Sequence, residues 1–145
     1  MSNGIIRPGF WNFRRILCGR VRCVEIKARY ETILFVTIER RQIANQVLLL
    51  VSGRMDAETA PQFEEKCKAC ISEGITNLVV DLGELAYISS MGLRSFVFVA
   101  KTLKGKGGAL RICRLTGLVK QVFEITGLIQ TFEVYESVES ALTGG

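Results

Sequence analysis

The feature that most constrains the fold is a regular alternation, from residue 34 onward, between short apolar runs and longer segments of helical period. The apolar runs have strand length and are rich in Val, Ile and Leu; they cover residues 34–39, 47–52, 77–82, 109–113 and 132–135. Strands that alternate with helices are typical of parallel sheets with crossover helices. The pattern predicts an α/β domain with a mixed, mostly parallel sheet of four to five strands and about four helices, in the order β-β-α-β-α-β-α-β-α. The first two strands, joined by a turn at 45–46, are expected to pair antiparallel.

Between these runs, apolar residues recur at the spacing of one helix face. Asp56 and Thr59 offer oxygens that can cap a first helix, and Gly53 and Gly74 are expected to end the strand before it and the helix itself. The predicted inward faces are Phe63, Cys67, Cys70 and Ile71 in the first helix, Leu93, Phe96, Val97, Ala100 and Leu103 in the second, and Leu118, Val122 and Ile125 in the third. A fourth, short helix is expected after Ser137.

The chain divides by charge into two parts. Its 145 residues suit one domain, yet residues 1–41 hold nine Lys and Arg against three Asp and Glu, whereas residues 42–145 hold ten against eleven. We therefore predict a basic N-terminal arm over 1–33, outside the domain, and a compact, nearly neutral domain over 34–143. Because the basic charge lies in the arm, we expect no direct nucleic-acid binding by the compact part.

Several functional classes lack their required residues. The chain has no histidine, which excludes Ser-His-Asp and Cys-His catalysis and HExxH zinc sites within it, and no glycine pattern matches a phosphate-binding loop. We expect a protein that is not an enzyme, without cofactor or metal. No apolar run approaches the roughly 18 residues that a membrane span needs, and five cysteines without a regular framework fit a reducing cytoplasm.

Cys67 and Cys70 form a CxxC pair, a spacing that occurs in zinc sites and redox centres. Here the pair lies in the middle of a predicted helix, on its apolar face, and Cys18 and Cys23 have the wrong spacing to complete a zinc site. Packing in the core is the favoured interpretation.

Two adjacent serines, Ser89 and Ser90, stand between the third strand and the second helix. A serine there can cap the helix, whose first N–H groups lack internal partners. A phosphoryl group at the same place would be stabilised by those donors and by the helix dipole, so a modification site is the second interpretation. We expect Gly92, in the first turn, to let another molecule approach closely.

The helical wheel after this turn places Met91 and Phe98 on the outward side, beside Arg94, Ser95 and Thr102. An exposed apolar patch next to a modifiable hydroxyl is typical of a partner-binding surface. Cover by a loop or by the arm is the alternative.

Four stretches, in order, resemble the STAS domain of bacterial anti-sigma factor antagonists over about residues 36–142. They are VSGRMDAETAPQF (51–63), LVVDLGELAYISSMGLRSF (78–96), KGGALRI (106–112) and VFEITGL (122–128). The resemblance implies the STAS fold and a cytoplasmic regulator of transcription. It also implies that an anti-sigma factor serine kinase binds the unmodified protein, releases its sigma factor, and then phosphorylates Ser90, two residues before Gly92. A phosphatase would reset the switch.

By the same resemblance, we expect the partner surface to be formed by Ser89, Met91, Gly92, Arg94, Ser95 and Phe98. Many switching members carry Asp immediately before the acceptor, where this chain has Ser89. The alternative function is therefore an unmodified STAS scaffold or subunit of a stress-signalling or transport assembly, and a homodimer is left open.

Overall fold

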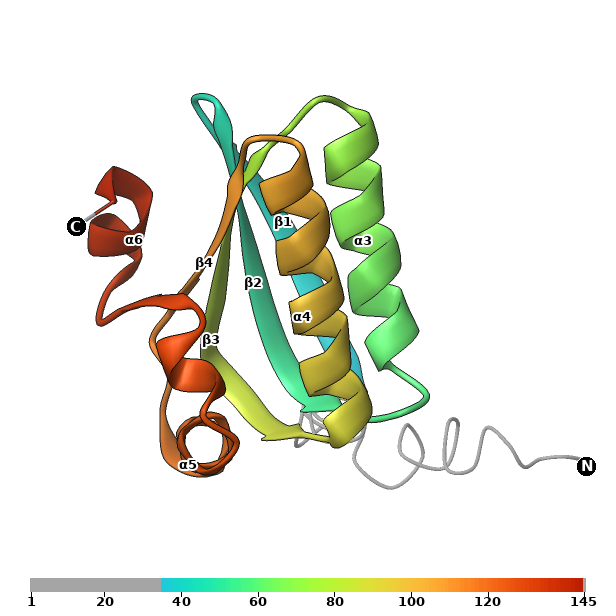
Figure 1. Cartoon of the computed structure of the whole chain (residues 1–145). Helices are drawn as coiled ribbons and strands as arrows, with labels where there is room; N and C mark the ends of the chain where they lie inside the picture. The colour runs from blue at the N-terminus through green and yellow to red at the C-terminus, as the bar shows by residue number, and fades with distance from the viewer. Residues whose placement is uncertain (1–34, 145) are drawn as a thin grey trace, which may run out of the picture.

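The computed structural model describes residues 35–144, and the predicted arm over 1–33 lies outside that range. The domain is built on a five-stranded sheet in the order β1-β2-β3-β4-β5 (Figure 1). The elements are β1 (Val36–Ile43), β2 (Gln46–Met55), α3 (Ala60–Ser72), β3 (Asn77–Ile88), α4 (Ser90–Gly105), β4 (Ala109–Cys113), α5 (Gly117–Ile125), the 3-10 helix η1 (Leu128–Gln130), β5 (Glu133–Tyr135) and α6 (Val138–Thr143). The β1-β2 pair is antiparallel and the other pairs are parallel, which confirms the predicted topology.

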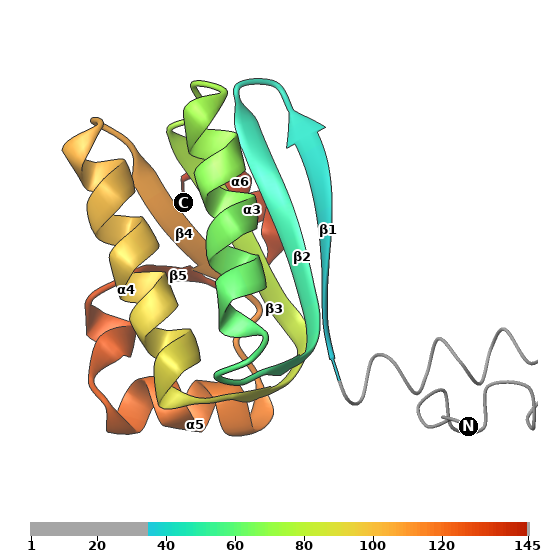
Figure 2. The same ribbon diagram turned by 90° about the vertical axis from the view of Figure 1, so that its right-hand side faces the viewer.

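The helices divide between the two faces of the sheet. Helices α3, α4 and α5 share a large core with one face, in which the rings of Phe63 and Phe96 stack with centroids 4.5 Å apart. Phe123 of α5 meets Phe96 edge-on at 5.9 Å, so one aromatic cluster joins three helices. The short α6 lies on the opposite face, where Ala141 packs with Leu48, Val79 and Cys113 (Figures 1 and 2).

Strands β2 and β3 are longer than the sequence pattern predicted. β2 does not end at Gly53 but continues to Met55, and β3 continues beyond residue 82 to Ile88. Pairing between the two strands sustains this length, and it includes two register shifts at which β3 carries one extra residue, between Leu50 and Ser52 and between Gly53 and Arg54 of β2. Across the two shifts, the apolar residues of β3 at 82, 85 and 88 all remain buried.

The predicted inward face of α5 is wrong at Leu118 and Ile125, whereas Val122 is partly buried and packs against the core as predicted. Val119 and Phe123 are fully buried there, whereas Leu118 is 51% exposed and Ile125 is 84% exposed. All five residues at 118, 119, 122, 123 and 125 are apolar, so helical spacing alone allowed two faces. The packing of Phe123 against the aromatic cluster selects the other one.

The CxxC prediction is confirmed as core packing. Cys67 and Cys70 are both buried in the main core, and burial raises the pKa of each thiol. Burial likewise raises the pKa of Cys113 to about 12. No group of three metal-ligating side chains occurs within residues 35–144.

Candidate functional site

The serine turn joins the carboxyl end of β3 directly to the amino end of α4. Ser89 is the N-cap residue, and its hydroxyl oxygen accepts a hydrogen bond from the backbone N–H of Gly92 at 3.3 Å. Its own backbone N–H donates to the carbonyl of Met55 at 2.8 Å, which ties the turn to the end of β2. Capping is therefore performed by Ser89, while Ser90, the first residue of α4, is exposed and makes no cap bond.

The surroundings of Ser90 favour an anion. The first turn of α4 contains no acidic residue, and the helix amino terminus carries a partial positive charge. A phosphoryl group on the Ser90 hydroxyl would lie beside backbone N–H groups without displacing the Ser89 cap. The structure thus assigns the cap to Ser89, and modification of Ser90 stays a prediction.

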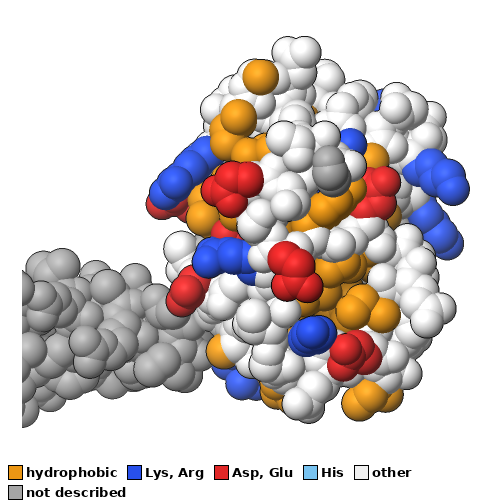
Figure 3. Space-filling model, turned by 90° about the vertical axis from the view of Figure 1, so that its left-hand side faces the viewer, with side chains coloured by type: hydrophobic (Ala, Val, Ile, Leu, Met, Phe, Trp, Pro, Cys, Tyr) orange, Lys and Arg blue, Asp and Glu red, His pale blue; other side chains and the backbone are white. Residues whose placement is uncertain are grey.

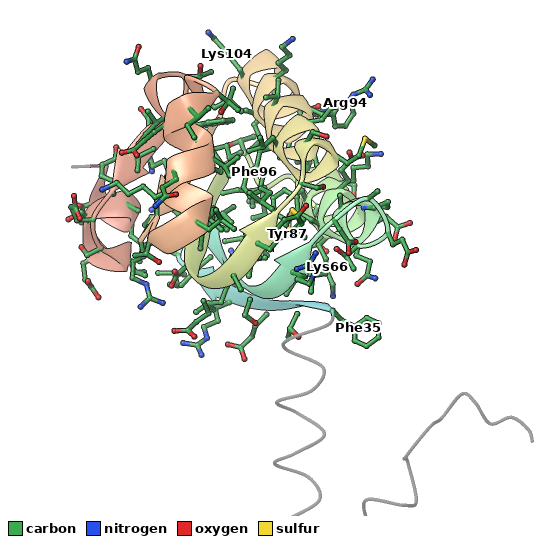
Figure 4. All side chains as sticks on the ribbon, turned by 90° about the horizontal axis from the view of Figure 1, so that it is seen from below. Phe35, Lys66, Tyr87, Arg94, Phe96 and Lys104 are labelled. Atoms are coloured by element: carbon green, nitrogen blue, oxygen red, sulfur yellow. The ribbon has the colours of Figure 1, made fainter. Side chains whose placement is uncertain are left out.

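Next to Ser90, the outward placement of three predicted surface residues is correct. Met91 is 43% exposed, Phe98 is 46% exposed, and Arg94 is also exposed, whereas Phe96 points into the core (Figure 4). The Nζ of Lys68 on α3 lies 5.2 Å from the ring centroid of Phe98, a cation-π contact that fixes one side of the ring. Met91, Arg94 and Phe98 form an exposed strip along α4 that begins at the serine turn.

Ser95 is not on this strip, so its predicted exposed placement is wrong. It is only 2% exposed, and its hydroxyl donates to Oε2 of Glu64 on α3 at 2.8 Å. The wheel placed Ser95 outward because it treated α4 as a helix with one buried side. In the fold α4 is covered by the sheet and also by α3, and that second contact buries Ser95.

Gly92 is also buried, and the expectation that it admits another molecule is wrong. A Cβ at this position would lie 2.7 Å from Cγ1 of Ile88 and 3.1 Å from Cγ of Met55. The missing side chain therefore serves the close approach of α4 to the ends of β2 and β3. Gly92 therefore acts on the serine turn through this packing, which holds the cap in place, and not through contact with another molecule.

Sequence reasoning missed a polar cluster on the opposite face of the sheet. Asp81, 2% exposed in the middle of β3, accepts hydrogen bonds from Nε and Nη2 of Arg114 at 2.9 and 2.7 Å and from the N–H of Gly83 at 2.9 Å. The hydrogen bond from Arg114 to Asp81 raises the pKa of the guanidinium. The sequence did contain a signal for this cluster, since Asp81 is a charged residue inside an apolar strand sequence and a buried carboxylate needs a partner.

This ion pair borders a shallow hollow of about 210 Å³. The other lining residues are Thr37, Glu39, Leu50, Val51, Ser52 and Glu84. Since both carboxylate oxygens of Asp81 are bonded to the Arg114 guanidinium, the cluster acts as a structural clamp between β3 and the chain after β4. On this same side of the sheet, which also carries α6, cationic and anionic side chains are interspersed on the surface (Figure 3).

Fold and site together define a mixed-sheet α/β domain whose candidate site lies on an exposed helix amino terminus. The chain belongs to the STAS domain family, whose model matches residues 37–141. Among residues 35–144, none of the helices combines the length and the apolar character needed to cross a membrane.

Relatives with this domain share a common name. BtrV of Bordetella bronchiseptica, which is named as an anti-sigma factor antagonist, is 38% identical over 100 residues, covering 69% of this chain and 86% of that protein. The anti-sigma-B factor antagonist of Listeria monocytogenes is 33% identical over 111 residues, covering 75% and 96%. A crystal structure of an anti-sigma factor antagonist from Mycobacterium paratuberculosis has a TM-score of 0.69 and 27% identity, covering 75% of this chain and 92% of the other.

Proposed function

We propose that this protein is a cytoplasmic anti-sigma factor antagonist that is switched by phosphorylation of Ser90. In its unmodified form it binds an anti-sigma factor that is also a serine kinase, and this binding frees the sigma factor. The observation that carries the proposal is the exposed Ser90 hydroxyl at the first position of α4, beside a separate capping serine. The name that the relatives share supports the same role.

The partner surface is the exposed strip that runs from the turn along α4. Met91 and Phe98 supply apolar area, and Arg94 supplies a charge that can pair with an acidic group of the kinase. Ser89 lies at the border of this strip and holds the turn in shape through its cap bond. Ser90 lies at the end of the strip, so a kinase bound to Met91 would also cover the Ser90 hydroxyl.

Phosphorylation would oppose this complex electrostatically. A phosphoryl group adds up to two negative charges, which remain solvated in the free protein but lose their water when the turn is covered. A penalty of about 3 kcal/mol would weaken binding by about a hundredfold, at 1.4 kcal/mol for each factor of ten. A phosphatase that hydrolyses the phosphoserine would restore the binding form.

Phosphotransfer tests the proposal directly. The full chain is incubated with candidate histidine-kinase-like serine kinases and ATP, and its intact mass is measured. We expect one phosphoryl group on the wild type and none on Ser90→Ala. The control is Ser89→Ala, which loses the cap, at a cost of about 1 kcal/mol in stability, but keeps the acceptor. Equal labelling of wild type and Ser90→Ala would refute Ser90 as the acceptor.

Binding to the kinase that labels the chain provides the second measurement. We expect Ser90→Asp to raise the dissociation constant by about tenfold to a hundredfold, because one carboxylate carries less charge than a phosphate. Ser90→Ala should bind like wild type but stay bound when ATP is added. If Ser90→Asp binds with wild-type affinity, the electrostatic switch is wrong.

One observation favours the alternative, an unmodified scaffold or subunit. Ser89 occupies the position where many switching members of the family carry Asp, and it uses its hydroxyl for the cap. A scaffold would retain native partners in a pulldown, and Ser90→Asp and Ser90→Ala would retain the same set. Loss of partners only in Ser90→Asp favours the switch.

A further inference from the structure

Strand β1 forms one edge of the sheet and has unusually high exposure for a strand. Among the described elements it pairs only with β2, and it is the outermost strand in Figure 2. All of its residues except Val36 and Ile38 are exposed. Ile43 at its carboxyl end is 36% exposed, and Phe35, just before it, is 51% exposed. An edge of this length offers a template for another strand.

The hydrogen-bonding phase of β1 identifies which of its backbone groups are unpaired. The N–H of Arg54 on β2 donates to the carbonyl of Phe35 at 3.2 Å, so the backbone groups of residue 35 point toward β2. Successive residues of a strand point their N–H and C=O groups to alternate sides. Residues 37, 39, 41 and 43 therefore bond to β2, and the groups of residues 36, 38, 40 and 42 point away from the sheet.

The charges on β1 are self-complementary in one antiparallel register. Pairing two copies about Arg40 places Glu39 of one copy opposite Arg41 of the other, twice over. Within each chain these side chains are already joined, with Nη2 of Arg41 2.7 Å from Oε1 of Glu39. The dimer would thus contain four alternating charges in one network on one face of the sheet.

The same register also places Arg40 opposite its own copy, but that charge is compensated. The Arg40 guanidinium binds the carboxylate of Glu73, the C-cap residue of α3, through two hydrogen bonds, of 2.6 and 3.0 Å. If the centre of pairing moved by one residue to Glu39, the two Glu39 carboxylates would instead face each other. Charge and hydrogen-bonding phase therefore agree on Arg40 as the centre.

We propose that two copies of this chain associate through antiparallel β1–β1 pairing centred on Arg40, which continues the sheet from five strands into ten. The inference does not depend on the proposed function, because no residue of the serine turn takes part. A single strand edge buries less than the roughly 1,200 Å² of a standard stable interface, so we expect a weak dimer that forms only at high protein concentration.

Sedimentation of the full chain from about 1 to 500 μM tests the proposal. We expect the mass to rise from monomer to dimer over this range. Arg41→Glu should raise the dissociation constant at least tenfold, because it places four like charges together. The double variant Glu39→Arg/Arg41→Glu should restore association, since it exchanges the signs but keeps every pair. Lys101→Glu, which makes the same charge change on α4, should associate like wild type.

A backbone variant separates strand pairing from charge attraction. Gln42→Pro removes an N–H that points away from β2, so it should weaken the dimer while circular dichroism stays that of the folded monomer. Gln42→Ala is its control and should associate normally. A wild type that is monomeric at every concentration would overturn the proposal. A dimer that Arg41→Glu and Gln42→Pro leave intact, or one that the double charge exchange fails to restore, would also overturn it.

Discussion

Replacing Gly92 by alanine tests the packing that holds α4 against the sheet. The new Cβ would lie 2.7 Å from Cγ1 of Ile88 and 3.2 Å from Sδ of Met55, both of which are buried. Overpacking of this kind costs about 1–3 kcal/mol, while exchanging Gly for Ala inside a helix contributes about 1 kcal/mol in the opposite direction. We expect Gly92→Ala to lower the free energy of unfolding by about 0–2 kcal/mol.

A matched variant in the same helix isolates the steric contribution. Gly105, the last residue of α4, would have nothing within 4 Å of an added Cβ. Gly105→Ala should therefore stabilise the protein by about 0.4–1 kcal/mol, through the lower conformational entropy of the unfolded chain. The free energies of unfolding of the two variants should differ by about 1–3 kcal/mol.

Urea denaturation of the full chain, followed by far-ultraviolet circular dichroism, measures this difference. For a small domain the slope is about 1–3 kcal/mol/M, so the midpoints of the two variants should differ by about 1 M, with Gly92→Ala the lower. If the midpoints coincide, or if Gly92→Ala unfolds at higher urea than wild type, then Gly92 is not required by the contacts with Ile88 and Met55.

Two further predictions concern loops at opposite ends of the strands. Hydrogen bonds from backbone N–H groups and from the Thr59 hydroxyl lower the pKa of the Asp56 carboxyl, although its partial burial opposes the shift. The stability that these bonds contribute is present above the unfolded pKa of 3.8 and is lost as the pH falls through the lower folded value. Between pH 6 and pH 3, the free energy of unfolding of Asp56→Asn should therefore fall by up to about 1 kcal/mol less than that of wild type, as measured by urea titrations at each pH. Gly108→Ala should lower the melting temperature severely or prevent folding, because its Cβ would lie 1.8 Å from the carbonyl oxygen of Thr76; a melting temperature within a few degrees of wild type would contradict this packing.

The succession of strands and helices along the chain and the mostly parallel direction of the strands could be predicted because both depend on local signals. Apolar runs of strand length, separated by segments of helical period, required crossover connections, and only the short turn before β2 allowed an antiparallel pair. The ends of β2 and β3 could not be predicted in this way. Gly53, which looked like a strand end, has a φ of 95° within the paired region, and this conformation is available to glycine without strain.

At the candidate site, the sequence indicated the turn and the exposed strip but not the roles of all its residues. Ser89 and Ser90 were equivalent as cap candidates until the hydrogen bond to Gly92 distinguished them. Ser95 was misplaced because burial by α3 depends on a contact between helices far apart in sequence, which no single helical wheel contains. The same limitation hid the pairing of Asp81 with Arg114, 33 residues later in the chain.

The two register shifts in β3 also limit which changes of chain length the domain can accept. Each extra residue lies outside the pairing, so the residues after it keep the same face as their β2 partners, and Ile88 stays opposite Met55 in the core. Deleting one residue at a shift, such as Gly83 or Ala86, would remove that bulge and restore regular alternation, with Ile88 still on the core side. In the uninterrupted register from Asn77 to Asp81 no residue is extra, so a single deletion there would turn the following side chains to the other face.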